Sequence, residues 1–326
     1  MHVPRMLAAV ALAVLATSSP AAPLLELVDT INLPSVKGRI DHLDADPANH
    51  RIFVAALGDD TVQVIDTRDR ARGTVRGLAK PQGIAYLPQL NQLVVANGNA
   101  GRVDFFDGKD FAAVHRVEGV ADADNVRYDA AARKVYVGYG NGGLRVIDPS
   151  SGAPEGDIPL PGHPEAFELE RDGTRIFVNV PTTRSIVVVD RQMRTRVATW
   201  EMGGAVGNFP MALDEAGRRL MVGTRSPAAV VVHDIDTGKV VARVPIGGDT
   251  DDLFFDAAHG RAYAICGEGR VDVVRRQAGD HYSLEGSVET EPGARTGLFV
   301  PQQRRLYVAA PPSRSAPARL LVFRVP

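Results

Sequence analysis

The chain has 326 residues, of which 44% are hydrophobic and 23% are charged, and its formal net charge is −2. This balance is typical of a globular protein with a large core, and it excludes the strong basic excess that marks an electrostatic nucleic-acid binder. The one cysteine, Cys266, cannot form a disulfide within the chain, which excludes a small disulfide-stabilised scaffold.

The first segment in chain order predicts a secretory signal peptide over residues 1–21. Arg5 precedes an apolar run over residues 6–16, and the small residues TSSPAAP follow. This run of 11 residues is too short to span a membrane, which takes about 20. Cleavage after Ala21 fits best, cleavage after Ser18 is the alternative, and the leader has no cysteine for a lipid anchor. We therefore expect a periplasmic or secreted protein with no membrane span and a mature domain over residues 22–326.

The rest of the chain repeats one short motif. The copies are RIFVA (51–55), QLVVA (92–96), KVYVG (134–138), RIFVN (175–179), RLMVG (219–223), RAYAI (261–265) and RLYVA (305–309). The fourth residues of successive copies are 41, 42, 41, 44, 42 and 44 positions apart. Around each copy we expect a preceding strand, a third strand such as VQVID (62–66) and a weaker fourth strand. Four short strands at this period are typical of one propeller blade.

The two ends of the chain are predicted to close the ring. The seventh copy ends with its third strand at residues 320–326, and residues 24–33 can supply the missing fourth strand. Pairing these segments removes an exposed sheet edge. We therefore predict an all-β, seven-bladed β-propeller with four antiparallel strands per blade, forming a single domain over residues 22–326.

The repeats RIFVAALGDDTVQVIDT (51–67) and RIFVNVPTTRSIVVVDR (175–191) resemble the YVTN-type repeat of the YncE-like family of bacterial secreted propellers. The resemblance covers essentially the whole mature chain, and it implies the same fold and export. Related seven-bladed folds include lactonases, cofactor-containing dehydrogenase subunits and binding proteins, so the resemblance does not select an activity. It also leaves single-stranded nucleic-acid binding as an alternative.

Equivalent positions in the blades can be compared by counting back from the fourth residue of each motif. Thirteen residues before it lie Asp41, Gln82, Asp124, Glu165, Phe209, Asp251 and Arg295. Neighbouring slots, twelve and fifteen residues before it, add His42, Asn125, Asp252, Arg39 and His163. The slot nine residues before it is uncharged in every copy and is predicted to face the core. We expect the polar side chains to converge where the innermost strands begin, at the channel mouth.

The predicted ligand-binding residues combine these slots with two residues from the loops between second and third strands. They are Arg39, Asp41, His42, Gln82, Asp124, Asn125, Tyr139, His163, Glu165, Phe209, Arg225, Asp251, Asp252 and Arg295. His42 and His163 are candidate acid/base residues. Carboxylates beside imidazoles suit a divalent cation, for which the candidate ligands are Asp41, Asp124, Glu165 and Asp251.

The structural alternative is that these Asp and Asn side chains only start strands by bonding nearby backbone amides. Five aspartates at or beside third-strand ends are interpreted in this way: Asp66, Asp107, Asp148, Asp190 and Asp234.

Three functions compete. The first is an exported binding protein that takes a small polar ligand or a protein partner at the channel mouth. The second is a metal-dependent enzyme of the lactonase or lyase type with its site at the same place. The third is single-stranded nucleic-acid binding, which is ranked last because an acidic ring repels phosphate and stacking would depend on Phe209 and Tyr139. We expect a monomer, and the sequence does not identify the ligand or the reaction.

Overall fold

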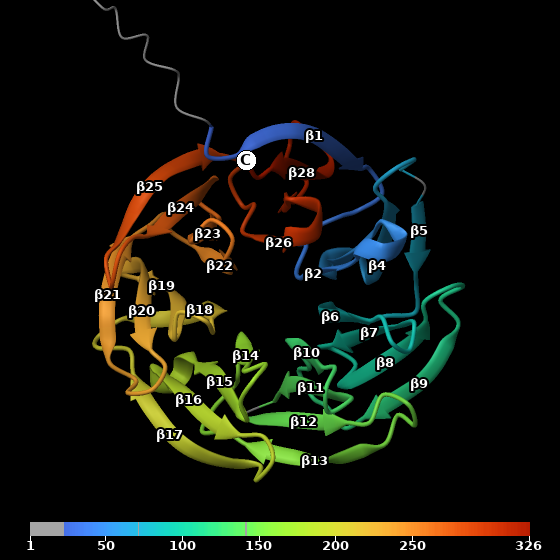
Figure 1. Cartoon of the computed structure of the whole chain (residues 1–326). Helices are drawn as coiled ribbons and strands as arrows, with labels where there is room; N and C mark the ends of the chain where they lie inside the picture. The colour runs from blue at the N-terminus through green and yellow to red at the C-terminus, as the bar shows by residue number, and fades with distance from the viewer. Residues whose placement is uncertain (1–22, 71, 141) are drawn as a thin grey trace, which may run out of the picture.

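The computed structural model describes residues 23–70, 72–140 and 142–326, and it consists of seven four-stranded antiparallel sheets around a central channel (Figure 1). The predicted signal peptide and its cleavage site lie outside the described residues. The first blade contains β2 (Leu43–Asp46), β3 (Arg51–Ala56), β4 (Thr61–Asp66) and β5 (Arg72–Val75). The second contains β6 (Pro81–Leu87), β7 (Gln92–Asn97), β8 (Arg102–Asp107) and β9 (Ala113–Glu118).

The third to sixth blades repeat this order, with the first strand of each next to the channel (Figure 1). The third contains β10 (Val126–Asp129), β11 (Lys134–Tyr139), β12 (Gly143–Ile147) and β13 (Pro154–Pro159). The fourth contains β14 (Phe167–Leu169), β15 (Arg175–Val180), β16 (Ser185–Asp190) and β17 (Thr195–Glu201). The fifth contains β18 (Val206–Asp214), β19 (Arg219–Ser226), β20 (Ala228–Asp234) and β21 (Val240–Pro245). The sixth contains β22 (Thr250–Asp256), β23 (Arg261–Cys266), β24 (Arg270–Arg276) and β25 (Tyr282–Glu289).

The seventh blade joins the two ends of the chain, as the sequence predicts. It contains β26 (Thr296–Val300), β27 (Arg305–Ala310), β28 (Ala318–Arg324) and, as its outermost strand, β1 (Glu26–Leu33). The strands β1 and β28 are antiparallel, with Leu33 opposite Ala318 and Glu26 opposite Arg324. The predicted seven blades, four strands per blade and N-terminal closure are therefore all confirmed.

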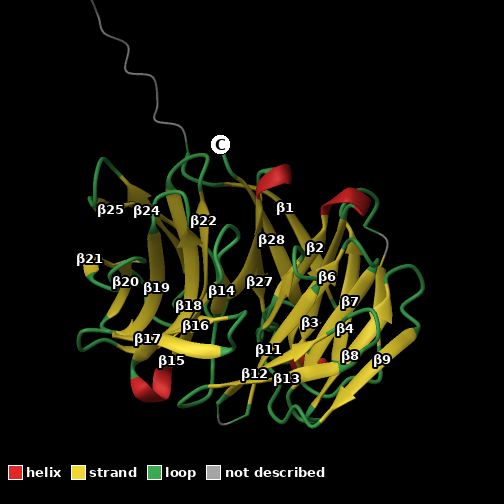
Figure 2. Cartoon of the chain, turned by 60° about the horizontal axis from the view of Figure 1, so that its bottom comes forward, coloured by secondary structure: helices red, strands yellow, loops and turns green. Residues whose placement is uncertain are grey.

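Helical structure in the described residues is limited to four short 3-10 turns at loops (Figure 2). These turns are η1 (Pro47–Asn49), η2 (Leu57–Asp59), η3 (Pro181–Thr183) and η4 (Pro301–Gln303). Within the described part of the chain, no helix has the length and apolar character needed to span a membrane.

Each repeated motif forms the second strand of its blade, and its fourth residue is fully buried in every copy. Alternating β-branched and aliphatic residues suit these strands, because both of their faces pack against neighbouring blades. The slot nine residues before the motif's fourth residue packs against the apolar clusters between blades, which confirms its predicted place in the core. Its members are Ala45, Tyr86, Tyr128, Leu169, Leu213, Phe255 and Phe299.

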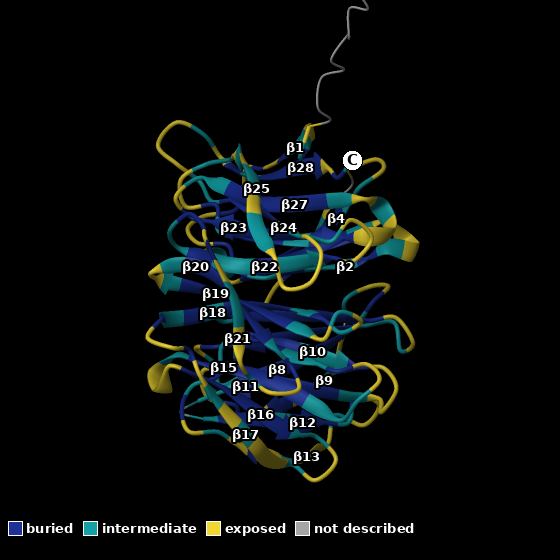
Figure 3. Cartoon of the chain, turned by 60° about the vertical axis from the view of Figure 1, so that its left-hand side comes forward, coloured by how far each residue is buried: buried dark blue, intermediate teal, exposed yellow. Residues whose placement is uncertain are grey.

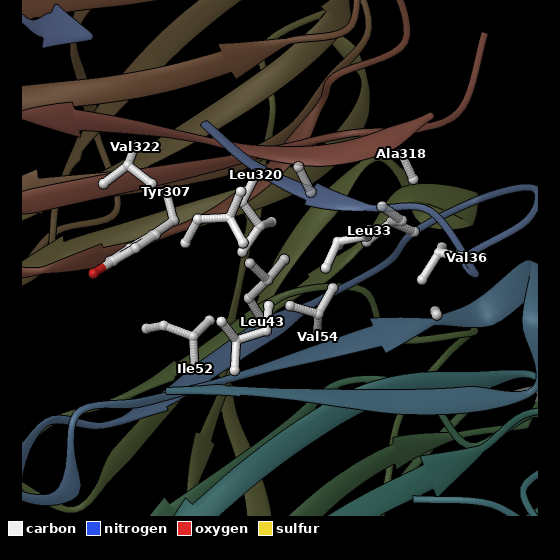
Figure 4. Close-up of a cluster of buried hydrophobic side chains, with 14 of the residues drawn as sticks. Leu33, Val36, Leu43, Ile52, Val54, Tyr307, Ala318, Leu320 and Val322 are labelled. Carbon is white, nitrogen blue, oxygen red and sulfur yellow. The ribbon is translucent and has the colours of Figure 1, made fainter. Parts of the chain in front are cut away.

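Burial falls from the second strand of each blade toward the outside. Exposed residues gather on the outer strands and the loops (Figure 3). One apolar cluster joins the seventh blade to the first and includes Leu33, Leu43, Val54 and Leu320 (Figure 4). Closure by β1 is therefore supported by buried side chains as well as by backbone pairing.

Candidate functional site

The site follows from the way each blade begins. The innermost strands β2, β6, β10, β14, β18, β22 and β26 surround the channel (Figure 1). The slot residues lie at or just before the starts of these strands or, for Phe209, within β18. We call the set of side chains at this end of the channel the mouth ring. It consists of Arg39, Asp41, His42, Asp124, Asn125, His163, Glu165, Phe209, Arg225, Asp251, Asp252 and Arg295.

The four carboxylates predicted to meet do meet. Asp41, Asp124, Glu165 and Asp251 come from four different blades and line one small space of about 20 Å³ at the axis. Arg39, His42, Asn125 and Phe209 line the same space. These side chains are separated by up to 210 positions in the sequence, so only the ring brings them together.

One side of the mouth ring is an arginine–aspartate network. Asp251 accepts a hydrogen bond from Arg225 at 2.6 Å and lies 2.9 Å from Nε of Arg295. Arg39 donates to Asp41 at 2.8 Å and lies 3.9 Å from Asp251. Charge-assisted contacts of this kind hold the side chains in fixed positions. The carboxylates on this side are therefore already paired with cations.

The other side of the mouth ring combines imidazoles with carboxylates. His42 lies between Asp252, at 3.5 Å, and Asp124, at 4.0 Å. His163 has Nε2 at 3.6 Å from Asp124, while its Nδ1 lies 2.7 Å from the carbonyl oxygen of Gly140 and donates to it. Both imidazoles are thus held by carboxylates of other blades.

The neighbouring charges shift the pKa values of both histidines. Burial alone would lower the pKa of His42, but its contact with Asp252 and the charges of Asp252, Asp41 and Asp124 raise it to about 10. The neighbouring carboxylate of Asp124 raises the pKa of His163 to about 9 despite the opposing effect of burial. At neutral pH both imidazoles are therefore protonated and act as hydrogen-bond donors.

Three carboxyl groups of the mouth ring have raised pKa values, as expected for crowded acids. Burial and the charge of Asp124 raise the pKa of Glu165 to about 8. Burial raises the pKa of Asp251 to about 6 although Arg295 and Arg225 oppose the shift. Burial also raises the pKa of Asp41. These carboxyl groups therefore keep their protons to higher pH than an exposed carboxyl group does.

Glu165 differs from the other carboxyl groups of the ring. Asp41, Asp124, Asp251 and Asp252 each have an ion pair with an arginine or a histidine. Among the described residues, none forms a hydrogen bond or an ion pair with the Glu165 side chain, although it lines the space at the axis. A partly buried carboxyl group without a partner is costly, so this is the position that a ligand would stabilise most.

Gln82 and Tyr139 lie beside the ring and have structural contacts. Gln82 is buried and donates to the carbonyl oxygen of Ala123 at 3.2 Å, which links the second blade to the third. The guanidinium carbon of Arg145 lies 5.2 Å from the ring centre of Tyr139. That tyrosine also packs against the apolar cluster between these blades.

The aromatic ring of Phe209 is likewise covered by a cation. The guanidinium carbon of Arg225 lies 4.0 Å from the centre of the Phe209 ring. A stacked arginine occupies the face that a nucleic-acid base would use. Phe209 and Tyr139 therefore each have an arginine against the ring, and neither has both faces free for a base to stack on.

The aspartates at third-strand ends have the structural role predicted for them. Their carboxylates accept from backbone N–H groups two residues later, at distances of 2.7–3.1 Å. These residues are Asp66, Asp107, Asp148, Asp190 and Asp234. The mouth ring does not follow this pattern, since its contacts run mainly between blades.

Within the described part of the chain, no three His, Cys, Asp or Glu side chains are grouped so that they could hold a metal ion. Arginines and histidines lie between the carboxylates that were predicted as ligands. Asp41, Asp124, Glu165 and Asp251 share the channel mouth, but metal binding by them stays a prediction.

A second polar layer lies deeper in the channel, and the sequence analysis did not predict it. It contains Asp44, Arg127 and Glu168, which all lie ten residues before the fourth residue of their motifs. With His42 and Asp252 they line a cavity of about 360 Å³ next to the mouth ring, which we call the chamber. The same counting applied to this slot would have found these residues.

No protein-family model matches this chain, and no curated protein matches it. Solved structures show the fold. A chain in "Crystal Structure of Mitotic Checkpoint Complex" has a TM-score of 0.79 and 14% identity, covering 98% of this chain and 99% of that one. A chain in "Kuenenia stuttgartiensis Hydrazine Synthase" has a TM-score of 0.76 and 17% identity, covering 89% and 98%. At these identities the likeness defines a seven-bladed β-propeller and no more.

Proposed function

We propose that this protein is an exported binding protein that recognises a small polar ligand at the mouth ring. The observation that carries the proposal is Glu165, a partly buried carboxyl group at the axis with no hydrogen-bond partner among the described residues. Buried polar groups in folded proteins are normally paired, and those left without a partner at a concave site are candidates for ligand contact.

The charge balance of the mouth ring indicates the kind of ligand. Arg39, Arg225, Arg295 and the two protonated histidines offset Asp41, Asp124, Asp251 and Asp252. A balanced ring favours a ligand that both donates and accepts hydrogen bonds over a polyanion. This supports the low rank of single-stranded nucleic acid, which needs a basic groove with stacking platforms.

The enzymatic alternative has less support. A histidine that is protonated at neutral pH can act as a general acid but not as a general base. The pKa values of about 10 for His42 and about 9 for His163 therefore suit binding better than proton abstraction. We include the YncE-like family relationship and export in the proposal, on the basis of the repeats and the leader at residues 1–21.

A thermal-shift screen of small polar compounds, repeated on ring variants, tests the proposal. Glu165→Gln and Asp124→Ala should abolish the shift given by hits that both donate and accept hydrogen bonds and carry no ammonium group, while Asp66→Ala, a control outside the ring, should retain it. Unchanged binding by both ring variants would overturn the proposal. Export is tested by expressing the full chain and determining the N-terminal residue of the exported protein, which should be Ala22.

A further inference from the structure

The chamber is a second place where the channel can hold a ligand. About 360 Å³ is within the range of small-molecule sites, whereas the mouth ring leaves only about 20 Å³ between its side chains. His42 and Asn125 line both spaces, so the chamber lies directly against the ring. A ligand body has room in the chamber that it does not have between the ring residues.

Asp44 brings a negative charge to the chamber. Its carboxylate accepts from the backbone N–H of Tyr86 at 2.6 Å and of Ala45 at 2.8 Å, which fixes its position. Among the described residues, no lysine, arginine or histidine lies within ion-pair distance of it. Burial raises the pKa of Asp44 to about 6, so the group is mostly ionised at neutral pH.

The other charges of the chamber are paired with each other. Arg127 lies 3.5 Å from Glu168 and also donates to Asn125 and to the carbonyl oxygen of Val126. His42 is paired with Asp252 at 3.5 Å. Asp44 is therefore the carboxylate of the chamber that has no ion-pair partner among the described residues.

The remaining walls are largely apolar. Ile84, Phe254 and Leu298 line the chamber and come from three blades. An ammonium group is attracted both to a carboxylate and to the face of an aromatic ring. An apolar body beside the cation would remove the aliphatic and aromatic walls from water.

We propose that the chamber binds a small organic cation, with its ammonium group on Asp44 and its apolar body against Phe254 and Leu298. The chamber proposal rests on the proposed function in one respect, namely that the channel is the ligand site. It differs from the proposed function in using chamber residues instead of the mouth ring and in naming a definite class of ligand. Arg127 acts on Asp44 only from beyond ion-pair distance, so the bound cation would supply the close ion pair that Asp44 lacks among the described residues.

Calorimetric titration of the mature protein at neutral pH with benzylamine, benzyl alcohol and benzoate tests the proposal. The three probes have similar size and differ in charge. Benzylamine should bind at least about tenfold more tightly than benzyl alcohol, a difference of about 1.4 kcal/mol, and benzoate should not bind measurably. Absence of benzylamine binding at millimolar concentrations, or equal binding of the alcohol, would overturn the proposal.

Variants locate the site. Asp44→Asn should weaken benzylamine binding by about tenfold or more. That variant places an amide against two backbone donors, so its folding is checked by thermal unfolding. Glu168→Gln is a second variant, which leaves Arg127 without its partner and should both weaken benzylamine binding and introduce benzoate binding.

A matched ring variant separates this inference from the proposed function. Asp124→Asn alters the mouth ring but no residue that lines the chamber. It should leave benzylamine binding within about twofold of the wild type. If Asp124→Asn abolishes benzylamine binding and Glu168→Gln does not change it, the ring is the cation site and the chamber inference is wrong. If the ring variants at Glu165 and Asp124 change the binding of no compound in either experiment, while Asp44→Asn and Glu168→Gln change benzylamine binding, the proposed function fails and the chamber inference stands.

Discussion

Truncating one side chain of β1 should measure how much the closing strand contributes to stability. Leu33 is 1% exposed and lies in the cluster between the seventh and first blades (Figure 4). Leu27 of the same strand is 54% exposed. Leu33→Ala should lower the free energy of unfolding by about 3 kcal/mol, since buried Leu→Ala changes cost about 2–5 kcal/mol. Leu27→Ala should change it by no more than about 0.5 kcal/mol.

The expected shift in melting temperature follows from the size of the domain. An unfolding entropy of about 2.1 cal/mol/K per residue gives roughly 0.6 kcal/mol/K for a chain of about 300 residues. The Leu33 variant should therefore melt about 5 °C below the wild type, and the Leu27 variant within about 1 °C of it. Calorimetry or circular dichroism at a fixed heating rate measures both. Equal losses for the two variants, or no loss for Leu33→Ala, would refute the argument that β1 closes the ring through buried packing.

Deleting residues 24–33 should cause aggregation or a much larger loss of melting temperature, because β28 would become an exposed edge; a soluble monomer with wild-type stability would contradict this. Glu165→Gln should flatten the pH dependence of stability. The pKa of Glu165 is raised to about 8 in the folded protein, from 4.5. Its contribution to the free energy of unfolding is therefore full below about pH 4.5 and is lost as the pH rises through about 8. The variant should gain stability relative to the wild type at pH 8 but not at pH 4. Asp251→Ala should lower the free energy of unfolding by about 2–4 kcal/mol because Arg225 and Arg295 lose their contacts with a largely buried carboxylate, whereas Asp66→Ala at a third-strand end should cost less; equal effects in a denaturant titration would count against the network. On the metal-dependent alternative, protein purified without added metal should contain one divalent ion per chain and EDTA should lower its melting temperature; elemental analysis that finds no ion would count against that alternative.

Asp251 shows where counting along the sequence stops being informative. The period of the motif predicts that Asp251 faces the channel, and it does. Its stabilising partners are Arg295, from another blade, and Arg225, from a second strand. Such contacts depend on how far each side chain reaches across the axis, which no spacing encodes. Asp251 therefore contributes to stability as well as to the predicted binding site, and its slot in the motif does not reveal this second role.

Fold and closure were predictable because they depend on strand patterning and on the removal of a sheet edge, and both are visible in the repeats. The convergence of the slot residues was predictable for the same reason, since equivalent blade positions point at one axis. Tyr139 was harder to place, because a loop residue can turn toward the channel or toward the core, and here it packs against the core and Arg145. Asp44 was not predicted because it lies in the slot ten residues before the fourth residue of its motif, one inward-facing position past the start of the strand.

The pairing of β1 with β28 has a consequence for the order in which the molecule can be assembled. Glu26 and Arg324 are neighbours in the finished sheet but are separated by 298 positions in the chain. The earliest strand to be synthesised must therefore wait, unpaired and partly apolar, until the last one has been made. For a protein that we propose is exported, this interval would span passage of the whole chain across the membrane. Six blades can form from local segments as they emerge, but the seventh needs the first-made and the last-made strand together.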